Sequence, residues 1–259
     1  MTVKAKNLLF ALRLIPALLA LGAAPALFAD QAAPAAEALV REMAAFDQAY
    51  IAALALSNQT KAEATARSMD ALDGRWRTFL AASSDAFPGD RAWKAGLEKV
   101  GAVLAKAAEE TKAGKIAEVH ETLEEVRAIF VELRAERKLS YYIDHLNRYH
   151  EVMELAAAAA VGKSADSFSS AEAAAVAAIL PGLRAEWKKA LEAEFDRELY
   201  LVGEAKAVEI KKAMQGTQGS IDRLAAALES GSSQQVFAAV NGLKPAFTKS
   251  FLMFAKFDL

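Results

Sequence analysis

The sequence predicts an all-α protein, an up-and-down helical bundle that is built from two four-helix units in tandem. Alanine is abundant, Lys and Glu occur throughout, and runs of β-branched residues are few, a composition that favours helix. Apolar residues recur three and four positions apart, as one face of a helix requires. Glycines, prolines and capping residues interrupt this pattern at intervals of roughly 20 residues, which is a typical length for a bundle helix.

The first 29 residues have the layout of a cleavable signal peptide. Three basic residues precede a short apolar run, 14–24, and the small residue Ala29 stands at the point after which we expect cleavage. An uncleaved membrane anchor is the alternative, but the apolar run is shorter than the roughly 20 residues that a span needs. We therefore predict export to the periplasm of a Gram-negative bacterium, with no membrane span after cleavage.

Charge and cysteine content exclude several classes of function. The formal net charge is −2 for the whole chain, and the leader carries three basic and no acidic residues, so the mature chain has a net charge of −5. A mildly acidic protein lacks the basic surface that nucleic-acid binding requires. The chain has no cysteine, which excludes disulfides, thiolate metal sites and covalently attached c-type haem.

Capping and helix-breaking residues in the first unit predict four helices. The first is expected to end near Leu56, and Thr60 with Glu63 has the spacing of a capping box for the second. A Pro-Gly pair then breaks the chain, and Asp90 is placed to cap a third helix. Gly114 ends that helix, and a fourth follows it.

The second unit begins with a helix that is expected to end near Gly162. Ser169 and Glu172 predict a capping box for the next helix, and Pro181 is expected to kink that helix near its start.

Three further signals divide the rest of this unit, and the first is Gly203. The glycine pair Gly216 and Gly219 is expected to interrupt the chain. Ser232 with Gln235 predicts a capping box for the last helix, which should run to Phe254.

The boundary between the units is predicted at residue 138, so that the units span 30–138 and 139–259. Ser140 is a candidate N-cap, and a turn is therefore expected within 134–142. The segment contains neither Gly nor Pro, so a continuous helix of about 45 residues, about 70 Å long, is the alternative.

Large apolar residues in the two units align in a way that predicts an internal duplication. The offset between partners increases along the chain, as loop insertions would produce. The aligned aromatic pairs are Phe46 with Tyr149, Trp76 with Trp187, and Phe130 with Phe247. The alternative is that unrelated stretches share only their helical periodicity. By their spacing both tryptophans are expected in the core.

All three histidines lie between residues 115 and 161, where any chemistry beyond packing is expected. His145 and His150 are five positions apart, which is about 140° around a helix, so they cannot chelate one ion together. If the chain turns at the boundary, His120 is about 14 Å from His150 along the helix axis. The spacing therefore argues against a single site that contains all three.

His150, Met153 and Glu154 form the first candidate metal site. The three side chains share one helix face, and an imidazole beside a thioether suits copper, especially Cu(I). The alternative is that Met153 is ordinary core and that His150 flanks this core with its polar edge in water.

His120 and Glu124, one helical turn apart, form the second candidate metal site. In an antiparallel bundle Asp47 and Tyr50 are expected to approach this end, and carboxylates with histidine suit iron, manganese or zinc. The alternative is a solvated ion-pairing edge, because His120 begins a stripe with seven-residue spacing that continues with Arg127 and Arg134.

No catalytic motif is present. The chain lacks Gly-x-Ser-x-Gly, His-Glu-x-x-His and glycine-rich phosphate loops, and therefore we do not expect an enzyme. The C-terminal run is apolar nearly all round, which predicts either burial or a contact surface for a protein partner. Its aromatic residues are Phe247, Phe251, Phe254 and Phe257. We predict a non-enzymatic periplasmic binding or interaction protein, with metal handling, copper above iron or zinc, as the alternative.

Overall fold

The computed structural model describes residues 29–257, which form eight α-helices and a short 3-10 helix, with no strand in that part of the chain. The predicted all-α class is confirmed. The helices are α1 (Ala29–Asn58), α2 (Ala62–Ser83), α3 (Arg91–Lys112), α4 (Ile116–Glu136), α5 (Tyr142–Ala158), α6 (Ser170–Glu192), α7 (Glu204–Ser230) and α8 (Ser233–Phe251), followed by the 3-10 helix η1 (Leu252–Phe254).

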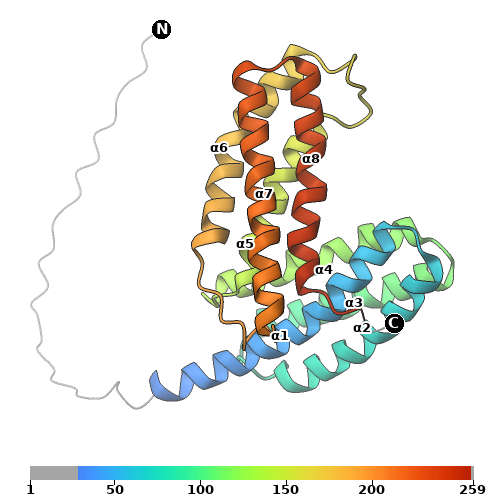
Figure 1. Ribbon diagram of the computed structural model, residues 1–259. Coiled ribbons are helices and arrows are strands. Elements are labelled where there is room, and N and C mark those ends of the chain that lie inside the picture. The colour runs from blue at the N-terminus through green and yellow to red at the C-terminus, as the bar shows by residue number, and fades with distance from the viewer. Residues whose placement is uncertain (1–28, 258–259) are drawn as a thin grey trace, which may run out of the picture.

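The helices pack as two rings of four. In the first ring each helix contacts the next in the chain, and α1 against α4 closes the ring. In the second ring α5 to α8 do the same, and α5 against α8 closes it. Figure 1 shows the two rings with their long axes crossed. The chain turns between Glu136 and Tyr142, so the alternative of one continuous helix is wrong.

Three predicted caps are confirmed. Asp90 accepts a hydrogen bond from the Trp93 backbone N–H at the start of α3. Ser169 and Ser232 each open a complete capping box, at α6 and α8. These caps satisfy backbone N–H groups that have no partner within the first turn of a helix.

Three other predictions about helix ends are wrong. The N-cap of α2 is Lys61, and Thr60 adopts φ 53° with its hydroxyl on the Gln59 carbonyl, a conformation that cannot cap. The N-cap of α5 is Tyr141 rather than Ser140, and it makes no side-chain cap.

The interruption predicted at the glycine pair is also wrong, because Gly216 and Gly219 lie inside α7, which is continuous to Ser230. An interior glycine costs a helix only about 1 kcal/mol, and packing against neighbours overrides this cost. Helix α6 includes Pro181, which lies in its middle and not near its start as expected.

Each ring has an aromatic centre. Phe46 packs against Trp76 at 5.8 Å and against Phe130 at 5.5 Å between ring centroids. In the second ring the predicted counterparts make the same contacts: Tyr149 packs against Trp187 at 4.7 Å and against Phe247 at 5.4 Å. Both tryptophans are buried, as expected. The duplication itself stays a prediction, because helical periodicity alone also brings large apolar residues into alignment.

The C-terminal run is mostly core. Phe247, Phe251 and Phe254 are buried, and η1 packs against α1, where the Lys256 N–H donates to the Gln48 carbonyl at 3.0 Å. Phe257 is 46% exposed. The run therefore joins the second ring to the first, and one continuous apolar core extends through both.

The predicted leader cannot be compared with the structure, because residues 1–28 lie outside the described residues. Among the helices of residues 29–257, none combines the length and the apolar character that crossing a bilayer would require.

A buried polar network lies at the turn between the rings. The Arg134 guanidinium donates to both carboxylate oxygens of Asp144, at 2.8 and 2.5 Å, and stacks on the Tyr141 ring at 4.3 Å. The Tyr141 hydroxyl donates to Asp47 of α1 at 2.6 Å. The network therefore ties α1, α4 and α5 together at the point where the chain passes between rings.

Gly96 allows the close approach of α3 and α4. A Cβ atom at this position would lie 2.5 Å from the Leu133 Cδ2 atom, well inside van der Waals contact. We expect Gly96→Ala to lower the free energy of unfolding by about 1–3 kcal/mol, as overpacking does, measured by urea denaturation. Gly101→Ala in the same helix is the matched control, because its Cβ would meet nothing closer than the Trp76 Nε1 atom at 3.6 Å. Equal stability of the two variants would contradict this explanation.

Candidate functional site

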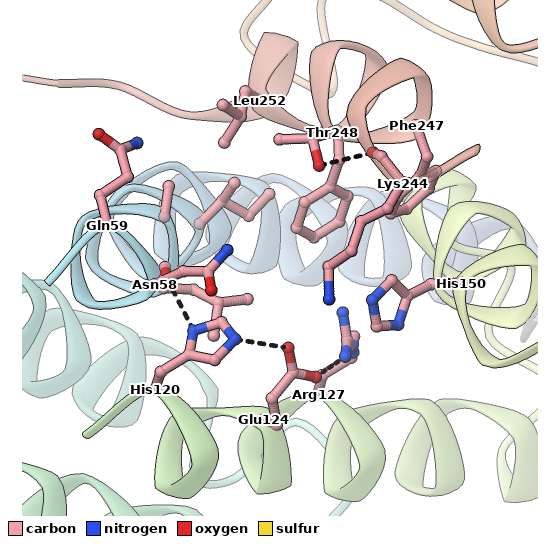
Figure 2. A pocket seen from close by; sticks show the side chains of 14 residues that line it. Asn58, Gln59, His120, Glu124, Arg127, His150, Lys244, Phe247, Thr248 and Leu252 are labelled. Carbon is pink, nitrogen blue, oxygen red and sulfur yellow. Dashed lines mark hydrogen bonds and ion pairs between the residues drawn. The ribbon is translucent and has the colours of Figure 1, made fainter. Parts of the chain in front are cut away.

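A hollow between the two rings is lined by three of the five candidate metal ligands, His120, Glu124 and His150 (Figure 2). Its walls come from the C-terminal part of α1, from α4 and from α5 and α8, so both rings contribute to it. The hollow has a volume of about 80 Å³, which accommodates a few water molecules or a small ligand. Phe247 and Leu252 supply part of its apolar wall.

Helix α4 contributes three polar side chains to the hollow. His120, Glu124 and Arg127 face one side because they are spaced by about one helical turn each. The His120 Nε2 atom lies 3.7 Å from Glu124 Oε1, and Arg127 forms an ion pair with Glu124 Oε2. On the other side of the imidazole, Nδ1 lies 3.1 Å from the Leu54 carbonyl oxygen of α1.

The second ring contributes His150 from α5 and Lys244 from α8. Both contact Glu154, whose Oε1 atom is 3.3 Å from His150 Nε2 and 2.9 Å from Lys244 Nζ. The hydrogen bond with His150 has the largest effect and the contact with Lys244 adds to it, so that the pKa of Glu154 is lowered to about 2. Figure 2 shows Lys244 reaching from α8 toward Arg127 and His150.

Both imidazoles of the hollow favour the neutral form. Burial lowers the pKa of His120 and His150 below the usual value of 6.5, and the positive charges of Arg127 and Lys244 lower them further. The side chains of His120, His150 and Arg127 are 17%, 13% and 10% exposed, so all three are largely buried. The basic side chains that line the hollow beside the imidazoles are Arg127 and Lys244, and each contacts a glutamate.

His120 and His150 line the same hollow, although helical spacing predicted that they lie at different heights along the helix axis. The expectation assumed that α5 runs antiparallel alongside α4 in one bundle. In the structure α5 belongs to the second, crossed ring. His145 does not line the hollow. Met153 is fully buried in the core, as the alternative for that residue expected, and it does not line the hollow with His150.

The first-helix residues expected beside His120 are engaged elsewhere. The Tyr50 hydroxyl donates to the Leu123 carbonyl at 2.8 Å, and Asp47 receives the Tyr141 hydroxyl. Within residues 29–257, no three His, Cys, Asp or Glu side chains are placed so that they could hold a metal ion together.

Arg127 and Lys244 are the polar residues of the site that sequence reasoning missed. Arg127 belongs to a stripe with His120 and Arg134, which has the pattern of a solvated edge; in the folded protein, however, the second ring covers this stripe and the Arg134 side chain is 3% exposed. Lys244 carries no local signal, because one lysine on a helix surface is ordinary.

Comparison of the chain with protein families, with curated proteins and with solved structures finds no match.

Proposed function

We propose that the protein is an exported, non-enzymatic binding protein that takes a small anion into the hollow between its two rings. The leader supports export to the periplasm, and the lack of a catalytic motif supports binding without turnover. The ligand class follows from the charges of the side chains that line the hollow.

The main support for this proposal is that two basic side chains from different rings line the same hollow. Arg127 comes from α4 and Lys244 from α8, and both line the same hollow, with Glu124 as the one carboxylate among the lining side chains. Each cation has one carboxylate partner, Glu124 for Arg127 and Glu154 for Lys244, and the remaining N–H groups of both can donate to an anion in the hollow. The guanidinium and ammonium groups also provide strong donors for carboxylate or phosphate oxygens.

Lys244→Met tests the proposal. Titration calorimetry with acetate, glycolate and phosphate is expected to show saturable binding of at least one of them to the wild type. The variant should bind that anion at least tenfold more weakly, because it loses one of the two cations. Lys249→Met is the matched control on the same helix, since Lys249 does not line this hollow but a groove between α7 and α8. No saturable binding of any of the three anions, or equal losses in the two variants, would overturn the proposal.

Metal handling is the second candidate, and one observation favours it. The Leu54 carbonyl fixes the His120 ring through Nδ1, as backbone carbonyls commonly do for metal-binding histidines, and Nε2 faces Glu124. Titration of the metal-free protein with Zn(II) and Cu(I) tests this candidate. Tight binding that His120→Leu abolishes would favour it for zinc, and loss of Cu(I) binding in His150→Ala with Met153→Leu would favour it for copper.

A further inference from the structure

The position of the proton on His120 is fixed by α1. A carbonyl oxygen accepts hydrogen bonds but cannot donate them, so Nδ1, 3.1 Å from the Leu54 oxygen, carries the proton of the ring. Burial keeps the ring neutral at pH 7 by lowering its pKa. The Nε2 atom therefore presents a lone pair to the hollow.

The Nε2 atom, which is a hydrogen-bond acceptor, faces another acceptor. Glu124 Oε1 lies 3.7 Å from Nε2, and the other carboxylate oxygen is held by Arg127. A carboxylate paired with a guanidinium accepts hydrogen bonds only, and 3.7 Å is too long for a direct bond. A group with at least two N–H bonds, such as an ammonium group, about 2.8 Å from each atom would satisfy both acceptors.

The donors of the hollow lie next to these acceptors. Arg127 holds Glu124 with part of its guanidinium fork, and Lys244 reaches toward Arg127 from the opposite helix (Figure 2). A ligand that satisfies both sets of groups carries a hydrogen-bond donor close to a negative charge. A metal ion would satisfy the acceptors but would add positive charge beside Arg127 and Lys244, which is unfavourable.

We propose that the hollow selects small carboxylic acids with an ammonium group on the neighbouring carbon. That group donates to His120 Nε2 and Glu124 Oε1, while the carboxylate binds Arg127 and Lys244. The volume of about 80 Å³ restricts the ligand to the smallest members of this class. This inference rests on the proposed function, which requires the negative charge alone.

Three ligands of nearly equal size test the inference. Propionate, glycolate and glycine differ at one position, which carries a methyl, a hydroxyl or an ammonium group. We expect glycine to bind the wild-type protein at least tenfold more tightly than propionate in titration calorimetry, because a site that lacks its hydrogen-bond partner keeps unpaired polar groups. Glycolate, whose one O–H can pair only one of the two acceptors, should lie between them.

His120→Leu is expected to remove this preference while anion binding through Lys244 remains. His145→Leu is the matched control, since His145 lies outside the hollow, and it should keep the wild-type ratio. Circular dichroism shows whether both variants stay helical; should His120→Leu unfold, Glu124→Gln replaces it, because its amide can present a donor in place of the acceptor. Equal affinity of the wild type for all three ligands would overturn the selectivity and leave the anion site standing. Absence of binding by all three would overturn the selectivity, and absence of acetate and phosphate binding as well would overturn the anion site too.

Discussion

Replacing Arg134 with methionine is expected to lower the free energy of unfolding by about 3–5 kcal/mol, the largest effect of any single substitution considered for this protein. The Arg134 side chain is 3% exposed and its guanidinium makes two hydrogen bonds to Asp144. Methionine fills a similar volume but removes the charge, so Asp144 and the neighbouring Asp47 remain buried without a cation. Denaturation with guanidinium chloride, monitored by circular dichroism, measures the loss.

Two further variants show whether the cost comes from the stranded carboxylate. Arg134→Met combined with Asp144→Leu removes both partners and should recover much of the lost stability, because an apolar pair of similar shape can replace a buried ion pair. Arg77→Met breaks a surface ion pair with Asp73, whose side chains are 73% and 61% exposed, and should change stability by less than about 0.5 kcal/mol. If the double variant is as unstable as Arg134→Met, lost packing explains the effect and the electrostatic account fails.

The helices were predictable because most of their signals are local. Asp90 and Ser232 cap helices through side chains that contact backbone groups three residues away. Such contacts do not depend on the rest of the fold. Thr60 failed because its positive φ, set by the turn into α2, removes the extended conformation that a cap needs. Gly216 failed because packing of α7 on its neighbours outweighs a small helix penalty.

The candidate site was predictable only in part. The one-turn spacing of His120 and Glu124 placed them together on one face, and the structure keeps them 3.7 Å apart. The sequence could not predict that Arg127 lines the hollow, because a charged stripe has the same spacing whether it faces water or a second ring. Lys244 reaches the hollow only because the rings cross, and crossing is set by the whole shape of the two apolar surfaces rather than by any short segment.

A second large effect is expected from Asp47, as a dependence of stability on pH. Burial raises the pKa of Asp47 from 3.8 to about 6, although the charge of Arg134 and the hydrogen bond from Tyr141 oppose this rise. A carboxyl group with a raised folded-state pKa contributes stability that is complete below about pH 3.8 and is lost as the pH rises through about 6. Since one pKa unit corresponds to about 1.4 kcal/mol, the loss amounts to about 3 kcal/mol.

The three histidines oppose this trend in the wild-type protein. Burial lowers the pKa of His120, His145 and His150, so the stability that they contribute is present above their unfolded pKa of 6.5 and falls as the pH drops below it. The wild-type curve therefore mixes two opposite slopes. The contribution of Asp47 has to be isolated as a difference between variants.

Asp47→Asn isolates it, because the amide oxygen can still accept the Tyr141 hydroxyl but does not titrate. We expect the stability of this variant relative to the wild type to rise by about 3 kcal/mol between about pH 4 and pH 8, measured by urea denaturation at each pH. Asp90→Asn is the control, because hydrogen bonding to the Trp93 backbone N–H lowers the pKa of Asp90, and its difference from the wild type should be flat above pH 4. A flat difference for Asp47→Asn would mean that Asp47 is ionised across the whole range, so that Arg134 neutralises two buried carboxylates even at pH 4 rather than only above about pH 6.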